Sequence, residues 1–164
     1  TSGQALITNG TGANPSWGTV AGGKILQVQH GNHTSQASTT STSYQDVSSN
    51  TNVSITPSAT SSKILVLAHF NECYHNSSAG NCSHYLAIYK DSTKIHEMHT
   101  NYTPNLTGEE MHSQDLIYVD SPNTTSALTY KLKFKSLSSS HAAVRVNQNG
   151  FVGGSTITLL EIGA

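Results

Sequence analysis

The apolar residues of this chain fall in short segments with a period of two, and this pattern limits the fold more than any other feature. Apolar residues at every second position are typical of β-strands, and no segment has a helical period. Turn signals such as Thr56-Pro57-Ser58 and Gln148-Asn149-Gly150 separate the segments. We expect strands over 24–30, 63–74, 83–90, 93–99, 113–120, 127–136, 141–148 and 155–162, and weaker ones over 44–47 and 52–56.

Many short strands at regular spacing predict an all-β protein, and an antiparallel β-sandwich of the jelly-roll kind is the favoured form. The 164 residues are enough for one domain with one core. Near the start, Asn9-Gly10 is a strong hairpin signal. We therefore expect a hairpin or arm over 1–22, leading from an upstream segment into a sandwich over 23–164. An isolated two-stranded ribbon is marginally stable, so the arm needs something to pack against.

The composition argues against two classes of partner. Charged residues make up only 10% of the chain, its net charge is −1 and its pI is about 6.7. Such a weak field favours neither nucleic acid nor an anionic membrane. No apolar run is long enough to span a bilayer and no signal peptide is recognisable, so we expect no membrane insertion. The first residue is Thr1 rather than methionine, which suggests a piece of a longer protein.

One predicted strand is apolar on both faces. In "ILVLAHF", Ile64, Val66, Ala68 and Phe70 alternate with Leu65, Leu67 and His69. An antiparallel strand in a single-chain sandwich usually has one face in water, so the second apolar face predicts cover by another subunit. The alternative is a central strand covered by loops of its own chain. The segment 115–119 has the same two-sided pattern.

Several strings resemble bacteriophage tail-fibre and related virion proteins. "GQALITNGTGANPSW" is similar to a segment found just before their C-terminal domains, and "GKILQVQ", "ITPSATSSKILV", "DSPNTTSALTYKLKFKS" and "GGSTITLLEIGA" resemble the domains themselves. The resemblance implies a homotrimer of β-sandwiches at the tip of a virion fibre, assembled in the host cytoplasm and binding a bacterial surface. It also implies that Leu6 and Trp17 of the arm pack against neighbouring chains. Tail and capsid fibres both remain open.

Two loop regions carry the chemistry of a glycan site. Sugar recognition uses amide and imidazole groups for hydroxyls and an aromatic face for the CH surface of the sugar. The regions 72–85 and 96–112 contain both kinds of group, although solvated connections would have a similar composition. We expect contacts to a host polysaccharide or lipopolysaccharide from Tyr74, His75, Asn76, His84, His99, Asn101, Tyr102 and Asn105.

Other groups have less specific interpretations. Among nine histidines, His69 is the best candidate for a metal ligand on a threefold axis, but hydrogen-bonded histidines are the favoured reading and no metal or cofactor is expected. Cys73 and Cys82 are compatible either with a cross-strand disulfide or with two thiols. Lysines 131, 133 and 135 share one strand face. They either attract anionic lipopolysaccharide or, as we favour, are charges on an exposed or edge strand that resist edge-to-edge aggregation.

No enzyme motif is present. The chain lacks a Gly-x-Ser-x-Gly elbow, a phosphate loop and a zinc-protease signature. The adjacent residues Glu109 and Glu110 would splay apart on a strand, whereas a glycosidase needs two carboxylates facing each other. The sequence therefore predicts a non-catalytic receptor-binding domain. A structural capsid fibre or decoration protein is the alternative, and a glycan-cleaving enzyme is less favoured.

Overall fold

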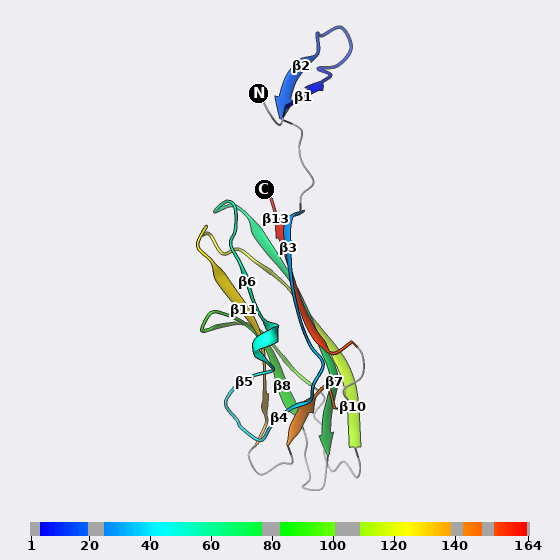
Figure 1. Cartoon of the computed structure of the whole chain (residues 1–164), viewed down its shortest axis with the longest axis vertical. Coiled ribbons are helices and arrows are strands. Elements are labelled where there is room, and N and C mark those ends of the chain that lie inside the picture. The colour runs from blue at the N-terminus through cyan, green and yellow to red at the C-terminus, as the bar shows by residue number, and fades with distance from the viewer. Residues whose placement is uncertain are drawn as a thin grey trace.

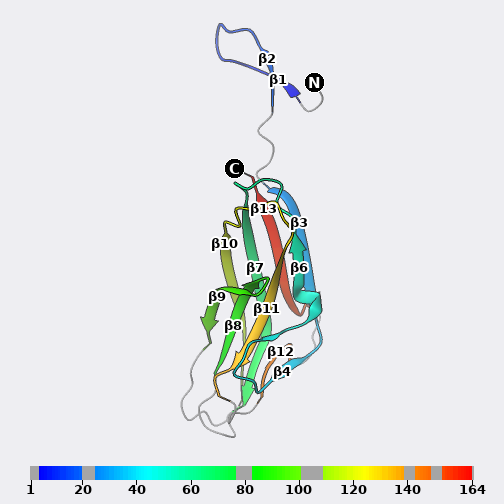
Figure 2. The same cartoon turned by 90° about the vertical axis from the view of Figure 1, so that its left-hand side faces the viewer.

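Two antiparallel sheets form a sandwich, and a separate hairpin lies beyond one of its ends (Figures 1 and 2). The computed structural model describes residues 4–19, 25–76, 83–100, 109–138, 143–148 and 153–163. The hairpin pairs β1 (Gln4–Ile7) with β2 (Ser16–Thr19). We call the end of the sandwich nearest this hairpin the arm end and the opposite end the far end.

The first sheet has the long strand β7 near its centre. Along its length β7 pairs with β10 on one side and with β13 and then β12 on the other. The outer strands are β3, which pairs with β13, and β4, which pairs with β12. The strands are β3 (Ile25–His33), β4 (Ala37–Thr39), β7 (Lys63–Asn76), β10 (Glu109–Asp120), β12 (Val144–Val146) and β13 (Ser155–Ile162).

The second sheet is built on β11, which pairs with β8 on one side and with β5 and β6 on the other. Its strands are β5 (Gln45–Asp46), β6 (Asn52–Ile55), β8 (His84–Lys90), β9 (Thr93–His99) and β11 (Leu128–Ser136). A single 3₁₀ turn, η1 (Ser49–Thr51), precedes β6. Within the described ranges, no helix is long and apolar enough to cross a membrane.

The strand order is that of a jelly roll. The main strands lie in the orders β3-β13-β7-β10 and β6-β11-β8-β9. Consecutive strands of these eight lie in opposite sheets, except for the hairpin β8–β9. This alternation winds the chain around the sandwich. The predicted all-β, antiparallel sandwich is therefore confirmed, and β9 and β13 have the predicted bounds, whereas the short β4 was not predicted.

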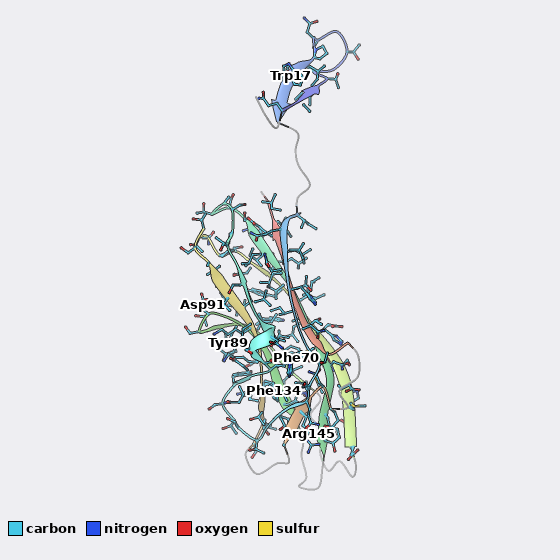
Figure 3. The ribbon with its side chains drawn as sticks, in the orientation of Figure 1. Trp17, Phe70, Tyr89, Asp91, Phe134 and Arg145 are labelled. Atoms are coloured by element: carbon cyan, nitrogen blue, oxygen red, sulfur yellow. The ribbon has the colours of Figure 1, made fainter. Side chains whose placement is uncertain are left out.

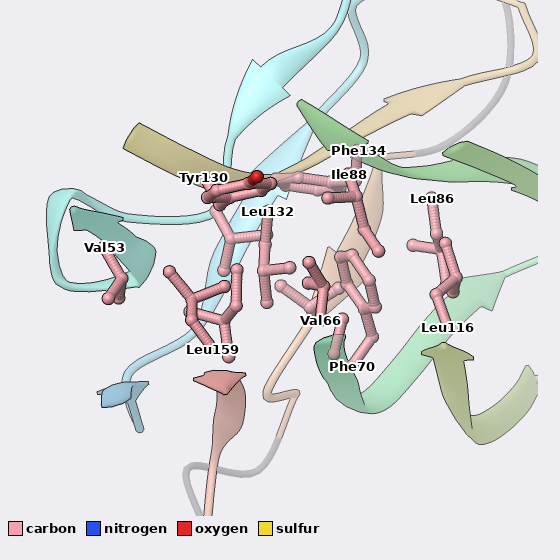
Figure 4. Close-up of a cluster of buried hydrophobic side chains, with 14 of the residues drawn as sticks. Val53, Val66, Phe70, Leu86, Ile88, Leu116, Tyr130, Leu132, Phe134 and Leu159 are labelled. Atoms are coloured by element: carbon pink, nitrogen blue, oxygen red, sulfur yellow. The ribbon is translucent and has the colours of Figure 1, made fainter. Parts of the chain in front are cut away.

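Alternate residues of the facing strands fill the core. Phe70 and Val66 of β7 pack toward Leu132 and Phe134 of β11 between the layers (Figures 3 and 4). Each of these side chains is almost completely buried, and burying one such side chain contributes about 1.5–3 kcal/mol. The core therefore ties the centre of each sheet to the centre of the other.

Near the arm end, the outer side of the first sheet is apolar and largely exposed. Val119, Leu65, Leu160 and Val28 lie side by side across its four main strands. In the adjacent row, Ile117 is paired with Leu67. Exposed fractions are 65% for Ile117, 54% for Val119 and 53% for Val28. We call these six residues the open face. The described loops leave the open face exposed. In the alternative interpretation, loops of the same chain would cover this second apolar face, and the described loops do not.

The hairpin also exposes its apolar residues. Trp17 is 68% exposed and Leu6 is 60% exposed, and they are cross-strand partners. Trp17 and the core aromatics lie far apart (Figure 3). The expected boundary between residues 22 and 23 falls in a segment outside the described residues. Within the part of the chain that is described, the hairpin has the unpaired apolar surface that the sequence predicts.

A buried carboxylate fixes the arm end of the sandwich. Glu161 of β13 has no exposed surface, and its Oε1 accepts hydrogen bonds from Ser58 N, Ser58 Oγ and Ser62 Oγ at 2.6–2.7 Å. Its Oε2 accepts one from Gln27 Nε2 at 2.6 Å. Burial opposes ionisation, but these hydrogen bonds outweigh it and lower the pKa of Glu161 to about 2. The carboxylate thus joins β13, β3 and the loop before β7 while it stays charged.

The Glu161 site predicts an acid-sensitive component of stability. The folded pKa lies below the unfolded value of about 4.5, so this contribution is complete above pH 4.5 and is lost as the pH falls toward 2. We expect Glu161→Gln to lower the free energy of unfolding by about 1–3 kcal/mol at neutral pH. The NH2 group of the new glutamine would replace an accepting oxygen and would face another hydrogen-bond donor. Thermal unfolding of both proteins between pH 7 and pH 2 checks this. A variant as acid-sensitive as the parent in that window would contradict it.

Gly31 of β3 is expected to tolerate no larger residue. A Cβ at this position would lie 2.4 Å from Asn50 O and 2.6 Å from Val53 Cγ2. Gly31→Ala should therefore destabilise the fold by about 1–3 kcal/mol through overpacking. Chemical denaturation measures the loss, and Asn32→Ala, at the next and exposed position, is the matched control. Equal stability of the two variants would show that β3 does not pack on η1 and β6 as described.

Candidate functional site

A β-bulge brings Tyr74 to the outside of the first sheet at the far end. Glu72 has a φ of 45°, and the pairing of β7 with β10 shifts between His112 and Gln114. The bulge changes which residues face inward, so Cys73 is buried in the core and Tyr74 lies on the outer side, in register with Met111 and Arg145. Bulges often re-aim a side chain at a functional position.

Three strands and two connecting segments contribute the polar groups at Tyr74. Its hydroxyl donates to Glu109 Oε1 at 2.7 Å, and the guanidinium carbon of Arg145 lies 5.1 Å from its ring centroid. Arg145 Nη1 donates to Gln148 Oε1 at 3.2 Å. Gln36 Nε2 donates to the same oxygen at 2.9 Å and to the backbone oxygen of Gln148 at 3.0 Å. These contacts hold a carboxylate, a phenol, a guanidinium and two amides at one end of the sandwich.

A pocket of about 250 Å³ opens within this group, lined by Tyr74, Glu109, Met111 and Gln148. The Nε atom of Arg145 is buried and has no hydrogen-bond partner among the described residues. The Glu109 carboxylate can accept hydrogen bonds, and the Gln148 amide can both donate and accept them. Met111 supplies an apolar wall. This combination suits a small polyhydroxylated ligand with one apolar side. Arg145 lies near the far end, opposite Trp17 (Figure 3).

The predicted glycan-binding residues of the two loop regions have different positions in the structure. Tyr74 lines the pocket, although only 5% of its surface is exposed. His84 is 1% exposed, lies on the inner side of β8 and is not part of the pocket lining. His75 and Asn76 are in β7, and their side chains lie outside the described residues. Asn101, Tyr102 and Asn105 also lie outside them.

His99 belongs to the other sheet. It is exposed at the end of β9, where its ring stacks on Tyr85 at a centroid distance of 4.4 Å, and Ser83 Oγ lies 2.5 Å from its Nε2. Tyr74 and His99 therefore lie on the outer sides of opposite sheets rather than in one cluster. A ligand of a few sugar units cannot be expected to touch both.

Sequence reasoning missed the charged partners of Tyr74. Arg145 is the one arginine of the chain and lies between two buried valines, Val144 and Val146, in an alternating segment. That pattern does predict an outward arginine on a strand. Nothing in the sequence places it beside Tyr74, because β12 and β7 are paired by the fold and lie about seventy residues apart.

The metal and disulfide hypotheses have different outcomes. His69 Nδ1 lies 2.7 Å from Asp115 Oδ1, beside the open face, and the described residues contain no group of three metal-ligating side chains. Cys73 is a free, buried thiol, and burial raises its pKa to about 12. Cys82 lies outside the described residues, so the structure leaves the disulfide unassigned.

No protein-family model matches the sequence, and no curated protein sequence matches it. The solved structures that the chain matches include chains from infectious bursal disease virus. A chain of the viral particle is 14% identical, with a TM-score of 0.43 over 97% of this chain and 40% of that chain. A chain from the Gx strain is 12% identical, with a TM-score of 0.39 over 97% and 42%. A mutant VP2 protein is 15% identical, with a TM-score of 0.38 over 96% and 40%.

The present chain spans about two fifths of the length of these viral chains. The jelly-roll assignment rests on the strand order described above.

Proposed function

We propose that this chain is the receptor-binding head of a virion fibre, which holds a cell-surface glycan in the Tyr74 pocket without cleaving it. The observation that supports this most directly is the position of the pocket. It lies at the far end of the sandwich, while the hairpin lies beyond the other end (Figures 1 and 3). A head that continues an upstream fibre through its N-terminal arm would present its far end to the cell.

The chemistry of the pocket supports binding. Tyr74 and Met111 offer apolar contact, and Glu109 and Gln148 offer hydrogen bonds to hydroxyls. Glu109 already accepts the Tyr74 hydroxyl, and the neighbouring Glu110 points to the opposite side of β10. Glycoside hydrolysis needs a second carboxylate across the ligand. The proposal is therefore recognition, with no release of oligosaccharide.

We further propose that three copies assemble through the open face and the hairpin. The open face is a continuous apolar patch with no charged member, and patches of this kind on soluble proteins mark interaction surfaces. Ile25 and Leu26, at 55% and 51% exposure, extend the exposed apolar surface of β3 toward its start. Because both this surface and Trp17 belong to every copy, copies of the chain can cover each other's apolar residues.

The open face favours one alternative function. A structural capsid fibre or decoration protein would need the same assembly surface but no ligand pocket. Adsorption experiments separate the two functions, since a purely structural protein would neither label host cells nor compete with the parent virus for them.

The Tyr74 pocket makes the first functional prediction. Tyr74→Ala should weaken adsorption to host cells about tenfold or more, because it removes the aromatic wall and a hydrogen-bonded partner of Glu109. Tyr74→Phe keeps the ring and should retain more binding. Adsorption of the purified, labelled protein measures both, with thermal unfolding as the control for the fold. Unchanged adsorption of the alanine variant would exclude this pocket as the receptor site.

The assembly prediction concerns mass in solution. Sedimentation should give three times the 17.4 kDa of one chain. Ile117→Asp together with Val119→Asp should dissociate the trimer, because each places a charge in an apolar contact. Thr93→Asp adds a charge at an exposed position of β9 and is the control. A cooperative, folded monomer at micromolar concentration for the parent protein would contradict the proposed assembly.

A further inference from the structure

The outer side of the second sheet carries a regular grid of lysine and aromatic side chains. Across β11, β8 and β9, Lys135 is paired with Tyr85 and then His99. Lys131 is paired in the same way with Tyr89 and then Lys94. Between these two rows lie Lys133, Ala87 and Glu97. Tyr89 lies on this side of the sandwich, away from the first sheet (Figure 3).

Tyr44, from the segment before β5, completes the grid. Its ring meets Tyr89 edge to face at a centroid distance of 5.5 Å, and its hydroxyl donates to Glu97. The small side chain of Ala87 at the centre of the grid leaves room for it. Burial and the bond to Glu97 both raise the pKa of Tyr44, so the hydroxyl stays protonated. We call Tyr44, Tyr85, Tyr89, Lys94, Lys133, Lys135 and His99 the tyrosine–lysine face.

The lysines on this face differ in their partners. Lys94 Nζ lies 2.5 Å from Glu97 and Lys133 Nζ lies 2.6 Å from Asp46, so both charges are compensated. Lys135 Nζ lies 4.6 Å from the ring centroid of Tyr85 and 4.9 Å from that of Tyr44. Among the described residues, it has no carboxylate within ion-pair distance. An ammonium group held between two rings is positioned in advance and retains its capacity to bind an anion.

Edge protection does not explain these lysines. That interpretation requires an edge strand, whereas β11 is paired on both sides, with β8 and with β5 and β6. Protection of a sheet edge therefore does not account for lysines 131, 133 and 135. Two of the three lie over tyrosine rings, since Lys133 Nζ also lies 5.1 Å from the ring centroid of Tyr89.

We propose that the tyrosine–lysine face is a second binding surface, for an acidic polysaccharide whose sugars carry carboxylates. The sugar rings would pack on the exposed parts of Tyr85 and His99, and a carboxylate would meet Lys135. The charges on this side of the sheet favour an anion, because four lysines (94, 131, 133 and 135) stand against Asp46 and Glu97. This surface is independent of the Tyr74 pocket, which belongs to the other sheet.

A single-stranded nucleic acid could also stack on tyrosines and pair with lysines. The net charge of −1 gives neither polyanion a long-range attraction, so the arrangement of the side chains decides between them. Lys135 lies between two rings, and the lysines of this face do not form a line of cations that could follow a nucleic-acid backbone. Acidic polysaccharide is therefore the ligand class that the charges and rings favour.

The test measures direct binding of defined oligomers by calorimetry. Oligogalacturonate should bind, its methyl ester should bind much more weakly, and raising the salt from about 50 mM to about 500 mM should weaken the former. Lys135→Gln should weaken oligogalacturonate binding about tenfold, the loss expected of one charge-assisted contact. Lys135→Met, which keeps the alkyl chain over the rings, should do the same and guards against a folding defect in the first variant.

The matched control is Lys63→Gln, which removes the same charge from the first sheet, where Lys63 Nζ contacts Ser121 Oγ at 2.7 Å. Equal losses in the Lys63 and Lys135 variants would reduce the effect to net charge and overturn the proposal. Equal affinity for the methyl ester, tighter binding of oligo-deoxythymidine, or no binding of oligogalacturonate would overturn it as well. Because the probe is a defined oligomer rather than a host cell, the outcome is independent of the adsorption measured for the Tyr74 pocket.

Discussion

The packing of β7 against β11 and β8 determines where every other part of the sandwich lies. The inward side chains Val66 and Phe70 meet Leu132 and Phe134, and this contact fixes the distance and angle between the sheets. Because β7 is the longest strand, it also positions β10, β13 and β12 along its two edges. The open face and the Tyr74 pocket are therefore both consequences of what β7 presents on its outer side.

Buried polar side chains hold neighbouring segments together toward the ends of the sandwich, beyond the apolar core. At the arm end, Glu161 links three segments through one carboxylate. Between the sheets, the Asp120 carboxylate accepts from Tyr130 at 2.6 Å and from Lys90 at 2.8 Å. Near the far end, the buried Asn147 donates to His33 and Ser35 oxygens. Each group has several partners, as burial of a polar atom requires, so each orders a connection that apolar packing alone would leave free.

Alternation of apolar and polar residues depends only on one strand and its two faces. It was therefore enough to predict the class of fold and the bounds of β9 and β13. It failed at the β7 bulge, where a residue with positive φ changes which side chains face inward. A count by twos from Phe70 would place Tyr74 in the core, whereas the bulge gives that position to Cys73. The relative position of the two regions that hold Tyr74 and His99 could not be predicted either. Proximity in the sequence says nothing about which sheet a strand joins, and the two residues belong to different sheets.

The distribution of polarity along the first sheet is compatible with the proposed assembly and the proposed recognition on a single chain. Its outer rows are apolar from Val119 to Val28 near the arm end and become polar at Asp115 and His69 toward the middle. The Tyr74 pocket lies farther along the same side, and the tyrosine–lysine face lies on the other sheet. Copies that pack through the apolar rows would therefore leave both binding surfaces in contact with solvent. Among the described residues, every large exposed hydrophobic residue except Met111 lies in the hairpin or in the arm-end part of this sheet.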